Sequence, residues 1–477
     1  MFVFKLLLTA LCVLGAFASY GQDKRPNVLL LSIDDLNDWI GCLEGHPQAI
    51  TPNIDKLAGK GTLFANAHCQ APVCQPSRSS MMTSTYPSST GLYFLSPGIR
   101  ESPVTKNAVT MPERFAKEGY KVFGAGKIFH HKLNNSVFKK VGEYLRTGGF
   151  GPSPKKKINY PIGHPLWDWG AYPNEDQKMP DYKLAEYGKK LLSQKFDKPF
   201  FMALGFYRPH VPMYAPQKWL DMYPLKDIKL PVIKKNDVAD LSDYAKNLTS
   251  LNHVSPTHKW ILDNDKQWEK ATQAYLASIT FVDHYVGEIL KALENGPNAD
   301  NTIVVLFSDH GFHMGEKEHW AKRTLWEDGT RVPVIIAGKG LNAKQVSKRP
   351  VGLIDIYPTL LDLCGIEKDD KHEGLSLKPL LNKPDAEWDT PARTSFGLGN
   401  HSIRSTKWRY IKYVDGSQEL YDLESDPNEW NNLASDPKYA DVLKEHAKWL
   451  PKNEKPILGK GSTGHKAYEA SAEALKK

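Results

Sequence analysis

Acidic, basic and imidazole side chains follow several short apolar runs of this sequence, each run having the length and composition of a buried β-strand. Ligands of an open α/β sheet bind beyond the carboxyl ends of its parallel strands, so residues in these positions meet at one edge. One such residue alone is usually a helix cap or a surface histidine, but several together indicate a binding or catalytic site. The residues that follow predicted strands are Asp34, Asp35, Lys127, His130, His210, Asp309 and His310.

The carboxylates of this set predict a cation site. Asp34, Asp35 and Asp309 would repel one another at one sheet edge unless a cation lies between them. Carboxylate oxygens favour calcium or magnesium, whereas an imidazole donor from His310 leaves manganese or zinc open. The remaining basic side chains, with Lys322, provide donors for an anion of the sulfate or phosphate type.

Strands alternate with helices along most of the chain. One helix is predicted at 110–117, where Thr110 and Glu113 have capping-box spacing, and a longer one at 267–294, where apolar residues recur at helical spacing. This alternation predicts an α/β fold with a doubly wound, mostly parallel sheet that helices cover on both faces. Strands are expected at 26–33, 121–125, 199–205, 302–307 and 332–337.

Near residue 390 the sequence changes to short strands rich in Tyr and Trp, followed by a helical tail. We interpret 22–389 as a catalytic domain and 390–477 as a smaller C-terminal α+β subdomain with a small antiparallel sheet. The segments 148–173 and 231–265 have no sustained period and are expected to be long loops that shape a pocket.

The amino terminus has the pattern of a cleaved secretory signal. Lys5 precedes an apolar run at 6–17, and small or polar residues follow, so we expect residues 1–21 to be a signal peptide. The run is shorter than the roughly 20 residues of a spanning helix, so no membrane insertion is expected after cleavage. The formal charge of +8 is spread along the chain without a nucleic-acid motif, and no nucleic-acid partner is expected.

The run Cys74-Gln75-Pro76-Ser77-Arg78 resembles the maturation signature of type I sulfatases, in which Cys-x-Pro-Ser-Arg directs oxidation of the cysteine to formylglycine. The similarity extends from about Asn27 to Leu433, and it implies an alkaline-phosphatase-like fold. The segments most similar to the active-site segments of iduronate-2-sulfatases are 34–36, 126–130, 205–210, 308–311, 315–316 and 320–322.

Carried over residue by residue, the resemblance implies roles for each matching position. One Ca²⁺ per chain would be held by Asp34, Asp35, Asp309 and His310, with the modified Cys74 completing the site. Arg78 and Lys127 would stabilise the hydrated formylglycine, and Lys127, His210 and Lys322 would hold the sulfate.

The implied reaction is hydrolysis of a sulfuric ester on a carbohydrate. A hydroxyl of the formylglycine hydrate at Cys74 would attack sulfur, His210 would protonate the leaving sugar oxygen, and His130 would assist the second hydroxyl in expelling sulfate. The expected substrates are oligosaccharides from polysaccharides, attacked from the end, with 2-O-sulfated uronate or a similar sugar, as in ulvan or glycosaminoglycan fragments. A formylglycine-generating or sulfatase-maturating enzyme is an implied partner, and the signal sequence favours the bacterial periplasm.

Some features depart from the family pattern. His131 stands where relatives often have proline, and the loops 148–173 and 231–265 differ, so iduronate specificity is not implied. If Cys74 is modified, the cysteines 42, 69 and 364 can form at most one disulfide. Two alternatives stay open: a phosphodiesterase or phosphonate monoester hydrolase on the same fold, and a non-catalytic glycan-binding relative. Further pocket candidates are Tyr207, Arg208, His313, His319, Arg323 and His401.

Overall fold

The computed structural model describes residues 25–130, 133–250, 255–459 and 468. The predicted signal peptide, His131 and the end of the predicted helical tail lie outside the described residues, whereas α14 (Ala440–Ala447) lies within that tail. Within the described part, no helix is both long enough and apolar enough to cross a bilayer.

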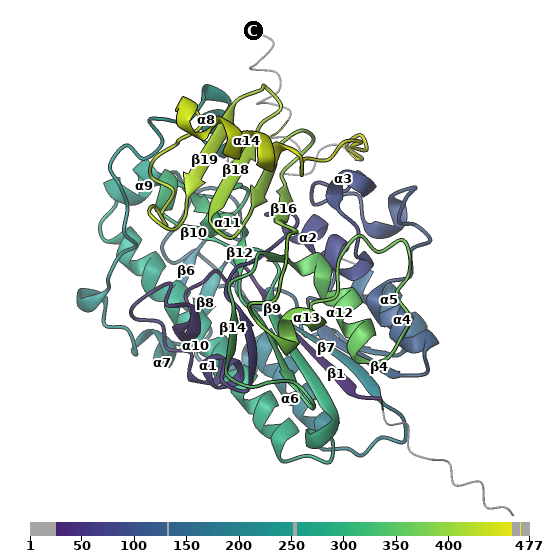
Figure 1. Ribbon diagram of the computed structural model, residues 1–477. Helices are drawn as coiled ribbons and strands as arrows, with labels where there is room; N and C mark the ends of the chain where they lie inside the picture. Colours follow the sequence, from purple (N-terminus) through teal and green to yellow (C-terminus); the bar gives the residue numbers. More distant parts are fainter. Residues whose placement is uncertain (1–24, 131–132, 251–254, 460–467, 469–477) are drawn as a thin grey trace, which may run out of the picture.

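A mixed sheet in the order β14-β2-β13-β9-β1-β7-β4-β5 forms the centre of the molecule (Figure 1). β1 pairs in parallel with both β7 and β9, whereas β13 runs antiparallel to its neighbours β9 and β2. The predicted doubly wound, mostly parallel α/β fold is confirmed, with β13 as the exception. The strands are β1 (Asn27–Asp34), β2 (Gly61–Phe64), β4 (Lys121–Gly126), β5 (Glu143–Leu145), β7 (Phe200–Pro209), β9 (Thr302–Ser308), β13 (Val334–Gly338) and β14 (Gln345–Ser347).

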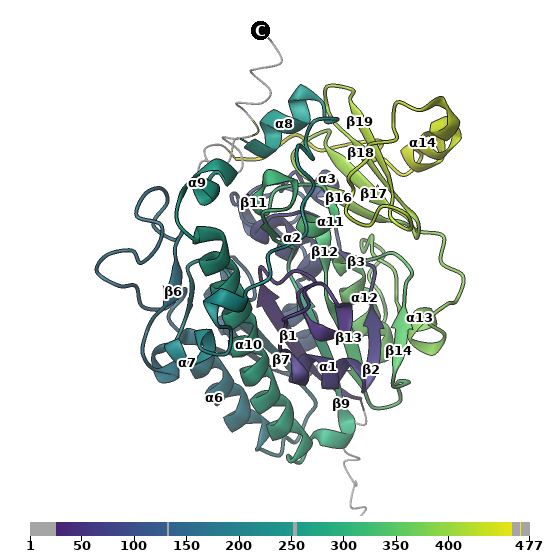
Figure 2. The same ribbon diagram turned by 90° about the vertical axis from the view of Figure 1, so that its left-hand side faces the viewer.

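Helices cover both faces of this sheet (Figures 1 and 2). The side chains of β1 alternate between two apolar cores: Leu29 and Leu31 enter one and Val28 and Leu30 the other. The first core also contains α1 (Pro52–Ala58), α6 (Pro180–Leu192), α7 (Gln217–Leu220) and α10 (Gln267–Glu294). The second contains α2 (Cys74–Thr83), α4 (Met111–Lys117), α5 (Leu133–Val141), α12 (Ile356–Leu363) and α13 (Lys378–Asn382).

A separate antiparallel sheet of four strands lies at one end of the molecule (Figure 1). It comprises β16 (Ala392–Ser395), β17 (His401–Arg404), β18 (Trp408–Lys412) and β19 (Gln418–Asp422), and α14 (Ala440–Ala447) packs against it. A smaller C-terminal subdomain therefore accompanies the main sheet. The exact limits 22–389 and 390–477 stay predictions.

The two segments expected to be loops contain short regular elements. The 231–265 segment holds α8 (Asp243–Ser250) and α9 (His258–Asp263), and 148–173 holds β6 (Trp169–Ala171), which pairs with β8 (Met213–Ala215). These elements have eight residues or fewer and are too short for their periodicity to be recognised in the sequence. Short elements elsewhere are α3 (Pro87–Thr90), α11 (Glu327–Thr330), β3 (Ala67–His68), β10 (His313–Met314), β11 (Trp320–Ala321), β12 (Arg331–Val332) and β15 (Val351–Gly352).

Candidate functional site

Two neighbouring strand ends bring the acidic residues together. β1 and β9 run in parallel with Ile33 opposite Ser308, so the residues that follow each strand emerge side by side. The backbone N–H of Asp35 donates to Oδ1 of Asp309 at 3.2 Å. Asp35 has a positive φ of 63°, and this turn directs the chain away from the sheet directly after Asp34.

Cys74 is the first residue of α2, and its side chain lies beside the strand-end aspartates. Its Sγ lies 3.2 Å from Nε2 of His310 and 3.5 Å from Nζ of Lys322, and the residue is 2% exposed. Donor atoms of Asp34, Asp35, Cys74 and His310 all lie within 4.8 Å of one another. The site therefore gathers residues from β1, β9, α2 and the loop before α11.

Arg78, one turn after Cys74, fixes α2 against the strand ends. Its Nε donates to Oδ2 of Asp309 at 2.8 Å, and its guanidinium also donates to Oδ1 of Asp34 at 3.3 Å. Further bonds reach the backbone carbonyls of Lys127 and Ile128. Because the side chain is fully buried, these contacts compensate for its loss of hydration.

Two lysines and a histidine surround the aspartates. Lys127 forms an ion pair with Oδ2 of Asp34, and Lys322 donates to Oδ1 of Asp35 at 2.5 Å. Nε2 of His210 lies 3.8 Å from Oδ2 of Asp35. The Nδ1 of His210 is 2.5 Å from the carbonyl of Val211, so Nδ1 carries the proton and Nε2 faces the site.

Burial and neighbouring charges shift the pKa values of the two adjacent aspartates in opposite directions. Burial disfavours ionisation of Asp34, yet the positive charges of Lys127 and Arg78 hold its pKa well below the usual value. Burial raises the pKa of Asp35 to about 7; Lys322 opposes this rise and the charge of Asp34 adds to it. A further positive charge at this position would therefore favour the ionised form of Asp35.

The nucleophile candidate and the histidine are both uncharged in this environment. Burial raises the pKa of the Cys74 thiol although Lys127 and Lys322 oppose the rise. Burial, reinforced by Lys322, lowers the pKa of His210 well below its usual value. An unmodified Cys74 would therefore be a thiol and not a thiolate, and so a weak nucleophile.

Asp309 and His130 differ from the rest of the predicted set. Asp309 does not belong to the group of four close donors. Its carboxylate accepts hydrogen bonds from Arg78 and from the Asp35 amide, and its Oδ2 is 3.6 Å from Nε2 of His310. His130 follows β4 and is half-buried. Both lie beyond strand ends as predicted, and their roles stay predictions.

Two residues that support the site had no recognisable sequence signal. The ring of Phe150 stacks on His210 at a centroid distance of 4.7 Å and lies 5.5 Å from Nζ of Lys127. Asp181 of α6 accepts the backbone N–H groups of Tyr207 and Arg208 at 2.7 and 3.2 Å. The sequence indicated a role for Phe150 only through its position in the 148–173 segment, which was predicted to shape the pocket.

The further pocket candidates have mainly structural contacts. Arg208 is fully buried and donates to the carbonyls of Phe150 and Tyr214, and Nε2 of His319 is 2.9 Å from the carbonyl of Lys322. His401 of β17 lies 2.9 Å from Ser395 Oγ and 3.1 Å from Glu454. The ring of Tyr207 contacts Phe150 edge-on. Burial lowers the pKa of Arg323, although the neighbouring carboxylate of Asp35 opposes this.

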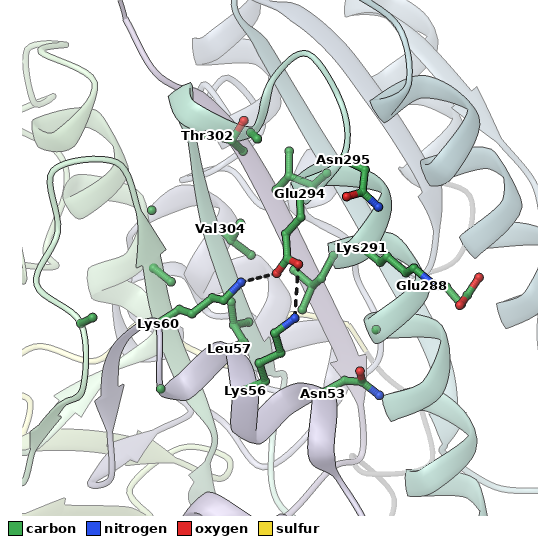
Figure 3. A pocket seen from close by; sticks show the side chains of 18 of the residues that line it. Asn53, Lys56, Leu57, Lys60, Glu288, Lys291, Glu294, Asn295, Thr302 and Val304 are labelled. Carbon is green, nitrogen blue, oxygen red and sulfur yellow. Dashed lines mark hydrogen bonds and ion pairs between the residues drawn. The ribbon is translucent and has the colours of Figure 1, made fainter.

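A groove of about 790 Å³ lies at the opposite end of the strands, between α1 and the end of α10 (Figure 3). Its walls include the first residue of β9, Thr302, whereas the acidic residues follow the last. Two lysines of the groove, Lys56 and Lys60, both pair with Glu294 (Figure 3). Their charge is therefore already neutralised in part, and the groove is distinct from the predicted site.

The fold and the converging strand ends define an alkaline-phosphatase-like α/β protein. Residues 26–366 match the sulfatase family, and 315–455 match the C-terminal region described as N-sulphoglucosamine sulphohydrolase. The chain therefore belongs to the sulfatase family.

Individual relatives agree with this assignment. A protein named sulfatase from Formosa agariphila is 40% identical over 94% of this chain and 91% of its own. The mouse iduronate 2-sulfatase is 27% identical, and the match covers 92% of this chain and 97% of the relative. A delta 4,5-hexuronate-2-O-sulfatase of Bacteroides thetaiotaomicron is 29% identical, and the match covers 92% of this chain and 89% of the relative. The phosphonate monoester hydrolase of Agrobacterium radiobacter shares the fold, with a TM-score of 0.72 at 22% identity over 89% and 95% of the chains. The predicted family resemblance is confirmed.

Proposed function

We propose that this protein hydrolyses the sulfate ester of a carbohydrate and that Cys74, oxidised to formylglycine, provides the nucleophile. The position of Cys74 carries the proposal: its Sγ is at the centre of the strand-end site, 3.2 Å from His310 and 3.5 Å from Lys322. The raised pKa of the thiol supports a need for modification, because burial keeps an unmodified cysteine protonated. A hydrated formylglycine would supply two hydroxyls, one for attack on sulfur and one for release of the product.

The donor set fits a divalent cation. Oδ2 of Asp35 is buried and has no hydrogen-bond partner among the described residues. Nδ1 of His310 is 3.0 Å from the carbonyl of Gly311, so Nδ1 carries the proton and the Nε2 lone pair faces Cys74 and Asp35. Asp34, Asp35, Asp309, His310 and the modified Cys74 would hold one Ca²⁺, which would polarise the sulfate oxygens.

The basic residues would hold the sulfate and stabilise the charge that develops on it. Lys127 and Lys322 each reach an aspartate across the site, so both ammonium groups are already in place before the substrate binds. Arg78, which contacts Asp34 and Asp309, keeps α2 and therefore Cys74 at a fixed position relative to the strand ends.

His210 is proposed as the group that protonates the leaving sugar oxygen through Nε2. In the site without substrate its pKa is lowered by burial and by Lys322, so the imidazole is neutral. The negative charge of a bound sulfate ester would raise this pKa and favour the protonated form. His130, half-buried beyond β4, is proposed to accept the proton that leaves during sulfate release.

The proposed substrate is an oligosaccharide with a 2-O-sulfated uronate or a similar sugar, attacked from its end. Support comes from the relatives named iduronate 2-sulfatase, delta 4,5-hexuronate-2-O-sulfatase and ulvan-active sulfatase, the last from Formosa agariphila. We also propose export to the periplasm and maturation by a formylglycine-generating or sulfatase-maturating enzyme.

The test begins with the protein co-expressed with a formylglycine-generating enzyme. Mass spectrometry of the Cys74 peptide should detect the aldehyde, and release of free sulfate is then measured on a panel of sulfated oligosaccharides. A chelator should abolish release and Ca²⁺ should restore it. The variant Cys42→Ala, which changes a half-buried cysteine outside the site, is the matched control and should retain activity.

Two results would overturn the proposal. One is a thiol at Cys74 that persists under co-expression while sulfate is still released. The other is hydrolysis of phosphodiesters or phosphonate monoesters in preference to every sulfate ester, which would assign the chemistry of the fold relative instead.

A further inference from the structure

A second cluster of possible metal donors lies beyond His310, outside the site described above. It consists of His313 on β10, Glu316 in the following turn and Asp328 on α11. One donor atom from each residue lies within 4.8 Å of the other two. The loop that these three residues enclose carries Lys322. Among the described residues, none of the three forms a hydrogen bond or ion pair with Cys74 or the strand-end aspartates.

His313 is the residue that points to a ligand. Its side chain is fully buried, and Nε2 lies 2.6 Å from Oγ1 of Thr324. Nδ1 is buried without a hydrogen-bond partner among the described residues, and Oδ2 of Asp328 is 3.8 Å away. If Nε2–H donates to Thr324, the lone pair of Nδ1 is directed at the carboxylates.

The charges around His313 also favour an added cation. Burial raises the pKa of Glu316 to about 7, and the charge of Asp38 adds to this rise. Burial raises the pKa of Asp328 well above its usual value, with contributions from Glu316 and Asp38. The nearby Arg331 pairs with Asp38 at 3.2 Å, so it does not neutralise the other two carboxylates by direct contact.

Burial, followed by the charge of His319, lowers the pKa of His313 well below its usual value. The backbone of Glu316 opposes this effect as a hydrogen-bond acceptor, although Nδ1 has no partner within hydrogen-bond geometry among the described residues. The imidazole is therefore neutral, which is the form that binds metals.

We propose that His313, Glu316 and Asp328 form a second cation site, for a first-row divalent metal ion such as Zn²⁺ or Mn²⁺. One imidazole nitrogen with two carboxylates suits these ions better than Ca²⁺, which prefers six to eight oxygen ligands. Two ligands that each lie about 2.0–2.2 Å from one ion are at most about 4.4 Å apart. Nδ1 of His313 and Oδ2 of Asp328 meet this condition at 3.8 Å. Asp328, which is 34% exposed, leaves a path for the ion and for water ligands.

A bound ion would stabilise the conformation of the loop that carries Lys322. Between β10 and α11 the backbone contains four non-glycine residues with positive φ: Lys317, Glu318, Ala321 and Arg323. Such conformations are unfavourable and persist only when surrounding contacts enforce them. A bound ion would join the start of this loop at His313 and Glu316 to its end at Asp328. The contacts that point to this site do not involve the reaction proposed at Cys74.

The test uses the full-length chain stripped of metal and then equilibrated with Zn²⁺ in excess Ca²⁺, so that Ca²⁺ occupies the oxygen-rich strand-end site. Bound zinc is counted by elemental analysis, and Co²⁺ is used in parallel because its visible spectrum reports nitrogen and oxygen ligands. The parent should bind one more Zn²⁺ than His313→Gln or Asp328→Asn. Zn²⁺ should also raise the Tm of the parent but not of these variants.

Matched controls are His284→Gln and Asp300→Asn, which change exposed residues on α10 and in the turn before β9 and should bind zinc as the parent does. If His313→Gln does not fold, Asp328→Asn decides, because its side chain is partly exposed. Equal zinc binding by the parent and Asp328→Asn would overturn the proposal. A parent that binds no zinc would also overturn it, because protons would then be sufficient to neutralise the two carboxylates. Neither result depends on sulfate release or on modification of Cys74.

Discussion

Cys74 occupies a position that suits a modified side chain better than a cysteine. Burial outweighs two neighbouring lysines and keeps the thiol protonated, whereas a hydrated aldehyde would place oxygen beside the same donors. The proposed chemistry also requires a second hydroxyl, since the first one becomes bonded to sulfur.

The substitution Cys74→Ser separates the two halves of this reaction. Serine has one hydroxyl, so we expect at most one sugar product per chain and a decrease in free sulfate of about 10³-fold or more. Sugar product and free sulfate are measured separately, and mass spectrometry verifies that the serine is unmodified and locates a sulfuryl group on it. Sustained release of sulfate by unmodified serine would contradict the proposed role of the second hydroxyl.

Arg78 should be sensitive even to replacement by lysine. Its guanidinium contacts Asp309, Asp34 and two backbone carbonyls in the interior, and a lysine cannot make these contacts together. For Arg78→Lys we expect a decrease in kcat/KM of about 10²-fold. Because Arg78 also belongs to the maturation signature, activity is divided by the fraction of formylglycine found by mass spectrometry.

Arg114→Lys on α4, where the side chain is 22% exposed, is the control for Arg78→Lys and should change kcat/KM little. If Arg78→Lys lowers only the formylglycine fraction and leaves the normalised kcat/KM unchanged, Arg78 serves maturation and does not position the site.

At the scale of the elements, α1 depends on a carboxylate from α10. Thr51 precedes α1 without a side-chain capping bond, and Asp283 of α10 instead accepts the N–H groups of Asn53 and Ile54 at 3.1 and 2.8 Å. Burial raises the pKa of Asp283 to about 6, although these donors oppose the rise. The helix therefore has its N-terminal cap supplied by another helix.

This shift predicts a pH dependence that Asp283→Asn should remove. Between about pH 4 and pH 6 the folded chain binds more protons at Asp283 than the unfolded chain, so its contribution to stability falls as pH rises. The loss amounts to about 3 kcal/mol at most. Asp283→Asn should therefore be less destabilising at pH 7 than at pH 4 in urea unfolding. A larger effect at pH 7 would contradict the shift, and Asp300→Asn is the exposed control.

The elements also indicate what the sequence could and could not predict. α10 begins and ends at the predicted residues because apolar residues recur at helical spacing along most of its 28 residues, and α4 has the predicted capping box. The antiparallel direction of β13 has no local signal, because a strand buried on both faces has the same composition in either direction. The strand-end aspartates were predictable from position, whereas Phe150 and Asp181 depend on how distant segments pack.

At the scale of the whole molecule, buried ion pairs join the C-terminal sheet to the loop that carries Lys322. Arg409 of β18 is fully buried, forms ion pairs with Glu327 of α11 and with Glu429, and donates to the carbonyl of Leu325 at 2.8 Å. Arg404 of β17 reaches Glu327 as well, at 3.2 Å. The C-terminal sheet therefore contacts α11 and the loop before it through charged groups that are costly to separate.

Replacing Arg409 by methionine tests whether the two sheets unfold as one unit. The change leaves Glu327 and Glu429 buried with less positive charge, so we expect the free energy of unfolding to fall by about 3–5 kcal/mol. Urea unfolding followed by tryptophan fluorescence and by circular dichroism should still give one shared transition, shifted to lower urea. Lys407→Ala, which removes a 41% exposed lysine with two surface ion pairs, should change stability by less than about 1 kcal/mol. Adding Glu429→Gln to Arg409→Met should recover part of the loss, because Glu327 keeps its ion pair with Arg404 whereas Glu429 loses its ion pair with Arg409. If Arg409→Met instead gives two separate transitions, the C-terminal sheet unfolds on its own and these ion pairs are what couple it to the catalytic sheet.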